Sequence, residues 1–209
     1  MLIIFDMEGV LVDEEFLPVL ARKIGKEKEV LDITLKGIRG EIDWEDGLMK
    51  RIDVLKGMNY EDVLEAANEM PLMKNAKETC DGLKKLGFVL VGVTGGFSIF
   101  SDRVKKELNL DYVFSNELVF ENGKLTGVRL SVNSDKSLAL TNLIRKLGSK
   151  KEEIVVVIDG ANDLKLFDIG GLKIAFNAQD IVKRQADVVI DGKDLMKLVP
   201  VIGEFNGRI

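Results

Sequence analysis

Three segments of the chain consist of consecutive apolar residues and end at a short polar motif. Continuous apolar runs, unlike alternating ones, are typical of strands buried on both faces of a parallel sheet. The runs are Leu2 to Phe5, Phe88 to Val93 and Ile154 to Ile158. Helical patterns follow the second and third runs, at Phe97 to Leu108 and Ala161 to Asp168. Strands that alternate with helices predict a doubly wound α/β core, a Rossmann-like fold with a parallel sheet.

The segment between the first and second apolar runs has a different pattern. It lacks a strong strand run and is rich in Lys, Glu and Leu. Four helices are predicted there, at Glu14 to Ile24, Lys26 to Gly37, Trp44 to Lys56 and Tyr60 to Glu69. We therefore expect a helical cap, residues 13–70, inserted into a catalytic core of residues 1–12 and 71–209.

Three other local signals concern single elements. An Asn-Gly pair, Asn122 and Gly123, separates two apolar segments and predicts a β-hairpin. The end of the chain, Gly203 to Ile209, is predicted to be a frayed tail. Cys80 is predicted to be a small buried hydrophobe within a helix.

The polar motifs that end the three apolar runs are expected to meet in space. They are Asp6-Met7-Glu8-Gly9, Thr94-Gly95-Gly96 and Asp159-Gly160-Ala161-Asn162-Asp163. In doubly wound sheets the ligand lies beyond the carboxyl ends of the strands. The fold can thus gather motifs that are far apart in the sequence into one site.

The acidic residues of these motifs have a possible chemistry. The carboxylate of Asp6 can attack phosphorus, while Glu8 can donate a proton to the leaving oxygen and then take one from water. Asp159 and Asp163, together with Asp6, can hold Mg²⁺, which prefers hard oxygen ligands. The structural alternatives are a turn pair at Asp6 and a helix N-terminus with acidic residues in its first turn at Asp159.

Two further features suit a phosphate. Thr94 supplies a hydroxyl, and the following Gly95 lets the backbone approach a phosphate closely. Lys136 starts a predicted helix, where it can pair with phosphoryl oxygens. A solvated surface lysine and a common glycine turn are the alternatives for these residues taken singly.

Composition removes several classes of function. The chain has no histidine and one cysteine, which excludes Ser-His-Asp and Cys-His catalysis and internal disulfides. Its net charge is -5, and no basic patch suggests a nucleic-acid or anionic-membrane partner. The N-terminal apolar run is short for a signal peptide, and no segment is long enough to span a membrane, so we expect a cytoplasmic protein. We expect it to be either a monomer or a homodimer.

Taken in order, the motifs resemble those of a known superfamily. Asp6 to Val10, Thr94 to Gly96, Lys136, and Asp159 to Asp163 resemble the four signature motifs of the haloacid dehalogenase (HAD) superfamily. Nearly the whole chain, cap included, resembles the phosphoserine phosphatase family within it. The resemblance implies a HAD core with an inserted cap. It also implies Mg²⁺-dependent hydrolysis of L-phosphoserine to serine and phosphate, the last step of serine biosynthesis.

The resemblance also implies a role for each matching residue. Asp6 is the nucleophile and a magnesium ligand, and Glu8 is the acid/base whose backbone carbonyl also meets the metal. Glu15 recognises the serine amine, and Arg51 recognises the serine carboxylate. The remaining residues are two further metal ligands, Asp159 and Asp163, and four phosphate contacts, Thr94, Gly95, Lys136 and Asn162.

Three departures from the family pattern keep alternatives open. Glu8 replaces an aspartate, Gly9-Val10 replaces Ser-Thr, and Ile158 replaces a glycine. The first two resemble a bacterial subgroup that transfers the phosphoryl group from phosphoserine to homoserine. A phosphotransferase, or a phosphatase for another small phosphorylated metabolite, is therefore the second hypothesis. A binding protein that has lost catalysis is the third.

Overall fold

A twisted sheet forms the centre of the molecule, and three of its strands contain the predicted apolar runs except Phe88. The structure, a computed structural model, describes residues 1–207. The strand order is β4-β3-β2-β1-β5-β6-β7, and all neighbours are parallel except β3 and β4. The strands are β1 (Leu2–Asp6), β2 (Val89–Phe97), β3 (Tyr112–Glu121), β4 (Lys124–Arg129), β5 (Ile154–Ile158), β6 (Leu172–Phe176) and β7 (Val188–Ile190). The predicted α/β class with a parallel sheet is confirmed.

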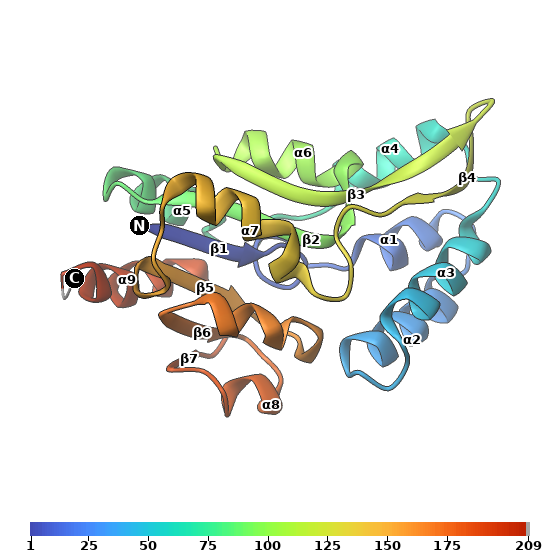
Figure 1. Ribbon diagram of the computed structural model, residues 1–209. Helices are drawn as coiled ribbons and strands as arrows, with labels where there is room; N and C mark the ends of the chain where they lie inside the picture. Colours follow the sequence, from blue (N-terminus) through green and yellow to red (C-terminus); the bar gives the residue numbers. More distant parts are fainter. Residues whose placement is uncertain (208–209) are drawn as a thin grey trace.

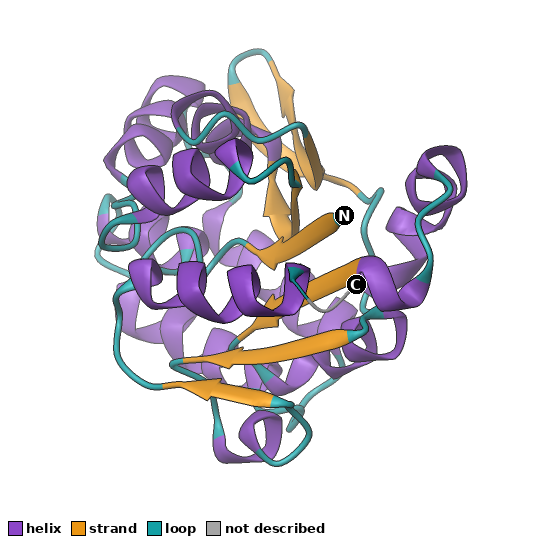
Figure 2. Cartoon of the chain, turned by 90° about the vertical axis from the view of Figure 1, so that its left-hand side faces the viewer, coloured by secondary structure: helices purple, strands orange, loops and turns teal. Residues whose placement is uncertain are grey.

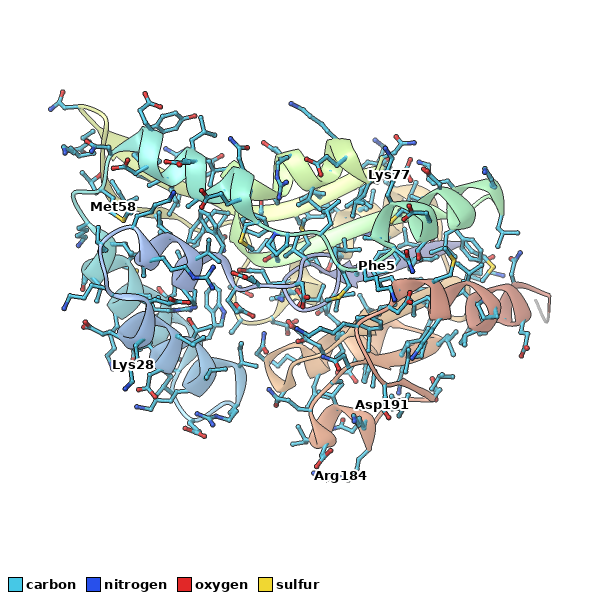
Figure 3. All side chains as sticks on the ribbon, turned by 180° about the vertical axis from the view of Figure 1, so that it is seen from behind. Phe5, Lys28, Met58, Lys77, Arg184 and Asp191 are labelled. Atoms are coloured by element: carbon cyan, nitrogen blue, oxygen red, sulfur yellow. The ribbon has the colours of Figure 1, made fainter. Side chains whose placement is uncertain are left out.

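Helices cover both faces of the sheet (Figure 2). Alternate residues of β1 enter different cores: Ile3 and Phe5 join one apolar cluster, and Leu2 and Ile4 join the other. Phe5 lies in the middle of the packed side chains (Figure 3). The first cluster is covered by α5 (Ala76–Lys85), α6 (Ser98–Glu107) and α9 (Leu198–Asn206), and the second by α7 (Lys136–Leu147), the 3₁₀ helix η2 (Ala161–Ile169) and α8 (Asp180–Lys183). Two short 3₁₀ turns complete the core, η1 (Lys151–Glu153) and η3 (Leu195–Lys197).

Four helices are inserted between β1 and α5, as predicted. They are α1 (Phe16–Arg22), α2 (Glu27–Ile38), α3 (Trp44–Leu55) and α4 (Tyr60–Glu69). The arrowheads of β1 and β2 point toward the side where α1 to α3 lie (Figure 1). The two connections to this insert pair with each other, since Asp13 N–H donates to Pro71 O at 2.9 Å and Met73 N–H donates to Leu11 O at 2.9 Å. The division at residues 13 and 70 remains a prediction.

The β3–β4 hairpin is also confirmed, and it extends to the inserted helices. Its turn residues Asn122 and Gly123 have φ values of 50° and 74°, as a type I′ turn requires. The hairpin pairs with the α3–α4 connection: Leu125 N–H donates to Met58 O and Tyr60 N–H donates to Gly123 O, both at 2.9 Å. Met58 lies at this end of the inserted helices (Figure 3). The insert is therefore attached to the core at a point far from its two chain connections.

Three predicted boundaries or elements differ from the structure. Strand β2 continues through the glycine motif to Phe97, and helix α6 begins only at Ser98. The helix predicted at Ala161 to Asp168 is a 3₁₀ helix rather than an α-helix. The predicted frayed tail is wrong up to Asn206, because α9 continues to that residue and Phe205 packs against the core; residues 208–209 of that prediction lie outside the described residues.

Within residues 1–207, no helix is both long and apolar enough to cross a bilayer. Cys80 is fully buried in α5, as predicted, and burial raises the pKa of its thiol to about 12. The thiol is therefore protonated and inaccessible at neutral pH.

Candidate active site

One cavity lies between the carboxyl ends of the strands and the inserted helices. Eight of the ten side chains or glycines predicted to form the site line it. They are Asp6, Glu8, Glu15, Arg51, Gly95, Lys136, Asp159 and Asn162. The other two, Thr94 and Asp163, are buried behind the lining and contact Glu8 and Lys136 respectively. The structure thus brings all ten together, while the role of each remains a prediction.

A buried lysine joins two of the carboxylates. Asp6 is the last residue of β1, and Lys136 is the first residue of α7, whose N-cap Asp135 accepts a hydrogen bond from Ser137 N–H. Lys136 Nζ lies 2.6 Å from Asp6 Oδ1 and 2.8 Å from Asp163 Oδ1. Burial lowers the pKa of Lys136, but attraction to the two aspartates outweighs it, so the pKa lies above its ordinary value. A fixed positive charge therefore lies beside the Asp6 carboxylate.

Three carboxylates form a cluster that suits a divalent cation. Ligand oxygens of Asp6, Asp159 and Asp163 lie within 4.8 Å of one another. Burial, followed by repulsion from Asp6, raises the pKa of Asp159 to about 7 and raises the pKa of Asp163 well above its ordinary value. Three crowded carboxylates against one lysine leave an excess of negative charge. Hard oxygen donors with such an excess fit a magnesium-type ion.

Glu8 is held by the first residue of the inserted helices. Its Oε1 accepts a hydrogen bond from Phe16 N–H at 2.9 Å, and its Oε2 accepts one from the Thr94 hydroxyl at 2.9 Å. Glu15, the N-cap of α1, makes no side-chain cap, so Glu8 satisfies the free N–H at this helix start. Burial raises the pKa of Glu8, although these two hydrogen bonds oppose the shift. The carboxyl therefore has a defined position and direction.

The Thr94-Gly95-Gly96 motif is a bulge in β2. These three residues face the single residue Ser115 of β3, between the pairs Val93–Phe114 and Phe97–Asn116. The bulge turns the backbone toward Glu8, because a Cβ at Gly96 would lie 2.6 Å from Glu8 Oε2. Glycine at this position therefore leaves room for the Glu8 carboxyl.

A buried asparagine that the sequence analysis missed fixes this bulge. Asn116 on β3 is fully buried, and its Nδ2 donates to Gly95 O at 2.9 Å. Its Oδ1 accepts hydrogen bonds from Ser131 N–H and Val132 N–H, both at 2.8 Å, in the segment that leads to Lys136. A polar residue within the apolar strand pattern of residues 112–121 was the available signal.

The same hydrogen bonds form a continuous chain that ends at Glu8. The Gly95–Gly96 peptide accepts from Asn116 on one side and donates from Gly96 N–H to Thr94 Oγ1 at 2.8 Å on the other. Because Thr94 Oγ1 accepts there, its own proton points to Glu8. Each donor points the same way, and such chains strengthen their members.

Two charged side chains of the inserted helices face the core residues. Burial and repulsion from Glu8, Asp159 and Asp6 raise the pKa of Glu15 well above its ordinary value, although Arg51 opposes the shift. Burial lowers the pKa of Arg51, opposed by attraction to Glu15 and Glu8. A carboxylate and a guanidinium on the wall opposite Asp6 can bind the amine and carboxylate of an amino acid.

An aromatic ring, also missed in the sequence, packs on the glycine motif. A Cβ at Gly95 would lie 2.9 Å from Trp44 Cζ2, so the ring at the start of α3 touches the backbone of β2. Trp44 and Thr34 line the cavity together with the predicted residues. No pattern in the chain distinguished these two residues from helix residues that pack only within the insert.

Comparisons with known proteins agree with this geometry. Residues 1–167 match the family of haloacid dehalogenase-like hydrolases. A phosphoserine phosphatase of Archaeoglobus fulgidus is 41% identical over 100% of this chain, which spans 62% of that relative's length. A phosphoserine phosphatase of Methanocaldococcus jannaschii is 38% identical, with 96% of this chain and 97% of the relative covered.

A solved structure is similar over the same length. It is described as a phospho-aspartyl intermediate analogue of phosphoserine phosphatase, with a TM-score of 0.92 and 38% identity over 96% of this chain and 97% of that one. The match covers both the sheet and the inserted helices. This chain belongs to the phosphoserine phosphatase family of the haloacid dehalogenase-like hydrolases.

Proposed function

We propose that the protein hydrolyses L-phosphoserine to serine and phosphate through a phospho-Asp6 intermediate. The observation that carries the proposal is a single cavity with two walls. The core wall presents Asp6, its partner Lys136 and the carboxylate cluster, and the opposite wall presents Glu15 and Arg51. One wall suits a phosphate and the other suits an amino acid, so a phosphorylated amino acid spans both.

The proposed reaction consists of two in-line transfers. In the first, an Asp6 oxygen bonds to phosphorus while the bond to the serine oxygen breaks, and Glu8 gives its proton to that oxygen. In the second, Glu8 takes a proton from a water molecule that attacks the phosphorus and releases phosphate from Asp6. Lys136 and Gly95 hold the phosphoryl oxygens during both transfers, and Thr94 joins them once its hydroxyl proton turns from Glu8 to the phosphate.

The metal site is part of the proposal. Asp6, Asp159 and Asp163, with the backbone carbonyl of Glu8, would hold Mg²⁺. When bound, Mg²⁺ supplies positive charge that stabilises the phosphoryl oxygens. Asn162 would lie beside the phosphate. Its side chain donates to Asp163 Oδ2 at 2.9 Å, which orients that carboxylate. We further propose that residues 13–70 act as the cap and residues 1–12 and 71–209 as the catalytic core.

The test is phosphate release from L-phosphoserine with and without Mg²⁺, against a panel of small phosphomonoesters. We expect selective, Mg²⁺-dependent release, and a loss of about 1,000-fold or more in kcat for Asp6→Asn because the nucleophile is removed. Asp81→Asn, an exposed aspartate of α5, is the matched control. Full activity of Asp6→Asn would contradict the mechanism.

A parallel set of reactions contains homoserine, because Glu8-Gly9-Val10 resembles the transferase subgroup. Formation of phosphohomoserine, with little phosphate release, would replace hydrolysis by transfer. Binding of Mg²⁺ and phosphoserine without any turnover would indicate a protein that has lost catalysis. Release from other phosphomonoesters alone would keep Asp6 as nucleophile and reject the roles of Glu15 and Arg51.

A further inference from the structure

The guanidinium of Arg51 is held at two points inside the inserted helices. Its Nε donates to Gly47 O on its own helix at 3.0 Å, and its Nη1 donates to Thr34 Oγ1 on α2 at 3.2 Å. The first contact comes from the same turn of α3, whereas the second joins two helices. The direction in which the guanidinium faces therefore depends on a residue of another helix.

The Thr34 hydroxyl is arranged to accept from Arg51. Thr34 is 1% exposed, and its Oγ1 donates its proton to Val30 O at 2.9 Å. A hydroxyl has one proton, so its lone pairs are left for the Arg51 Nη1. A threonine that bonds back to the preceding helical turn gives the helix no stability by itself. Packing alone would be satisfied by valine, which has the same shape.

The two contacts leave the outer end of the guanidinium free for a ligand. Arg51 and Thr34 both line the cavity that contains Glu15 and Asp6. With Nε and one Nη1 proton engaged, the other N–H groups of Nη1 and Nη2 remain to bind a carboxylate as a fork. A guanidinium already fixed in direction loses less conformational entropy when the carboxylate binds.

We propose that Thr34 is a positioning residue that aims Arg51 at the substrate carboxylate and so sets specificity for phosphorylated amino acids over phosphorylated amines. The inference rests on the proposed function, since it requires Arg51 to bind that carboxylate. It predicts an effect confined to ligands that carry a carboxylate. A merely structural role of Thr34 would weaken all phosphate ligands alike.

The test is Thr34→Val, which removes only the hydroxyl. We expect KM for L-phosphoserine to rise about three- to tenfold, the net value of one typical hydrogen bond, with a smaller change in kcat. The inhibition constant of O-phosphoethanolamine, which is phosphoserine without its carboxylate, should not change. Thr34→Ser keeps the hydroxyl and should restore the KM.

Thr141→Val is the matched control. Thr141 also bonds back to the preceding turn of its helix, donating to Ser137 O at 3.4 Å, but it is exposed on α7. Its substitution should leave both constants unchanged. Equal weakening of phosphoserine and O-phosphoethanolamine by Thr34→Val, or no weakening of either, would overturn the positioning role.

The variant Arg51→Ala shows whether a negative result concerns the positioning role of Thr34 or the proposed function itself. If Arg51→Ala weakens phosphoserine but not O-phosphoethanolamine, the carboxylate assignment holds, and Thr34→Val alone decides the inference. If Arg51→Ala weakens neither or weakens both equally, the carboxylate assignment is rejected, and the role of Thr34 is rejected with it.

Discussion

At the scale of single residues, the environment of Glu8 explains how its carboxyl is held beside the glycine motif. The Glu8 carboxyl lies so close to Gly96 that a Cβ there would be 2.6 Å from its Oε2. Phe16 N–H and the Thr94 hydroxyl then hold its two oxygens. Asn116 lies at the other end of the same hydrogen-bond chain, is 0% exposed, and reaches the cavity only through Gly95.

The first prediction concerns Asn116. Asn116→Leu leaves Gly95 O, Ser131 N–H and Val132 N–H without their partner. We expect the free energy of unfolding to fall by about 3 kcal/mol or more, because each buried unpaired group costs about 1–3 kcal/mol. We also expect kcat to fall, because the bulge that holds Thr94 loosens. Chemical denaturation and steady-state kinetics measure the two effects.

Asn116→Asp tests separately the donor and the acceptor of the Asn116 side-chain amide. Its carboxylate still accepts from Ser131 and Val132 but cannot donate to Gly95 O. Stability should therefore recover in part while kcat stays low. Equal stability of Asn116→Leu and the unsubstituted protein would show that the buried hydrogen bonds contribute nothing.

At the scale of elements, the β3–β4 hairpin attaches the inserted helices to the core. Gly57 N–H donates to Leu125 O at 2.8 Å, and the rings of Tyr60 and Phe120 meet edge to face with centroids 5.2 Å apart. The α3–α4 connection is therefore fixed, like the chain connections at Asp13 and Pro71. Any opening of the cavity must move the far ends of α2 and α3 more than α4.

The second prediction tests this attachment at the hairpin turn. Gly123 has a φ of 74°, which alanine adopts only with strain, whereas a Cβ there would meet no other atom within 4 Å. Any destabilisation by alanine therefore comes from the backbone conformation alone. We expect Gly123→Ala to lower the free energy of unfolding by about 1–2 kcal/mol. Gly127→Ala is the matched control, because Gly127 lies in β4 with open space and no positive φ.

Proteolysis gives a second measurement for the same variants. Cleavage within residues 13–70 should become faster in Gly123→Ala than in Gly127→Ala, because the loosened hairpin frees the α3–α4 connection. Identical cleavage patterns would contradict an attachment through the hairpin.

At the scale of the whole molecule, two halves meet over a strongly acidic cavity. Asp6, Asp159 and Asp163 crowd their carboxylates together below the inserted helices. Burial, and then repulsion from Asp6, raise the pKa of Asp159 and Asp163; both effects oppose folding with these groups ionised at neutral pH, and a bound cation relieves them. Trp44 is the only tryptophan of the chain, so its fluorescence reports how closely the inserted helices rest on the core.

The third prediction concerns the metal. Adding Mg²⁺ to EDTA-treated protein should raise the unfolding temperature. The free energy of unfolding should rise by about 2.7 kcal/mol when Mg²⁺ is at 100 times its Kd. Asp159→Asn should lose this gain, and Asp81→Asn should keep it. An equal gain in all three proteins would show that Mg²⁺ acts elsewhere than at the carboxylate cluster.

The fourth prediction concerns closure. Gly95→Ala places a methyl group 2.9 Å from the Trp44 ring, which must move outward. We expect the fluorescence emission to shift to longer wavelength, because the ring becomes more exposed to water, and KM for L-phosphoserine to rise. Gly82→Ala, whose Cβ would meet only Val199 Cγ2 at 3.9 Å, is the control. An unchanged emission spectrum would show that Trp44 does not rest on Gly95.

The sequence by itself determined the architecture and the composition of the core wall. Continuous apolar runs specify strands buried on both faces, and parallel strands present their carboxyl ends at one edge. Asp6, Thr94 and Asp159 each come directly after one of these apolar runs, so their meeting required no knowledge of packing. The hairpin and the four inserted helices were equally visible, because turn chemistry and helical periodicity are local properties.

Only the tertiary structure decided which groups hold the catalytic side chains in place. Asn116 reaches Gly95, Phe16 N–H reaches Glu8, and Thr34 reaches Arg51 across 17 positions and between two helices. Periodicity reports whether a side chain is buried, but a hydrogen-bond partner depends on which elements pack together and in which register. The end of β2 and the helical C-terminus were decided in the same way, by pairing and packing with segments distant in the sequence.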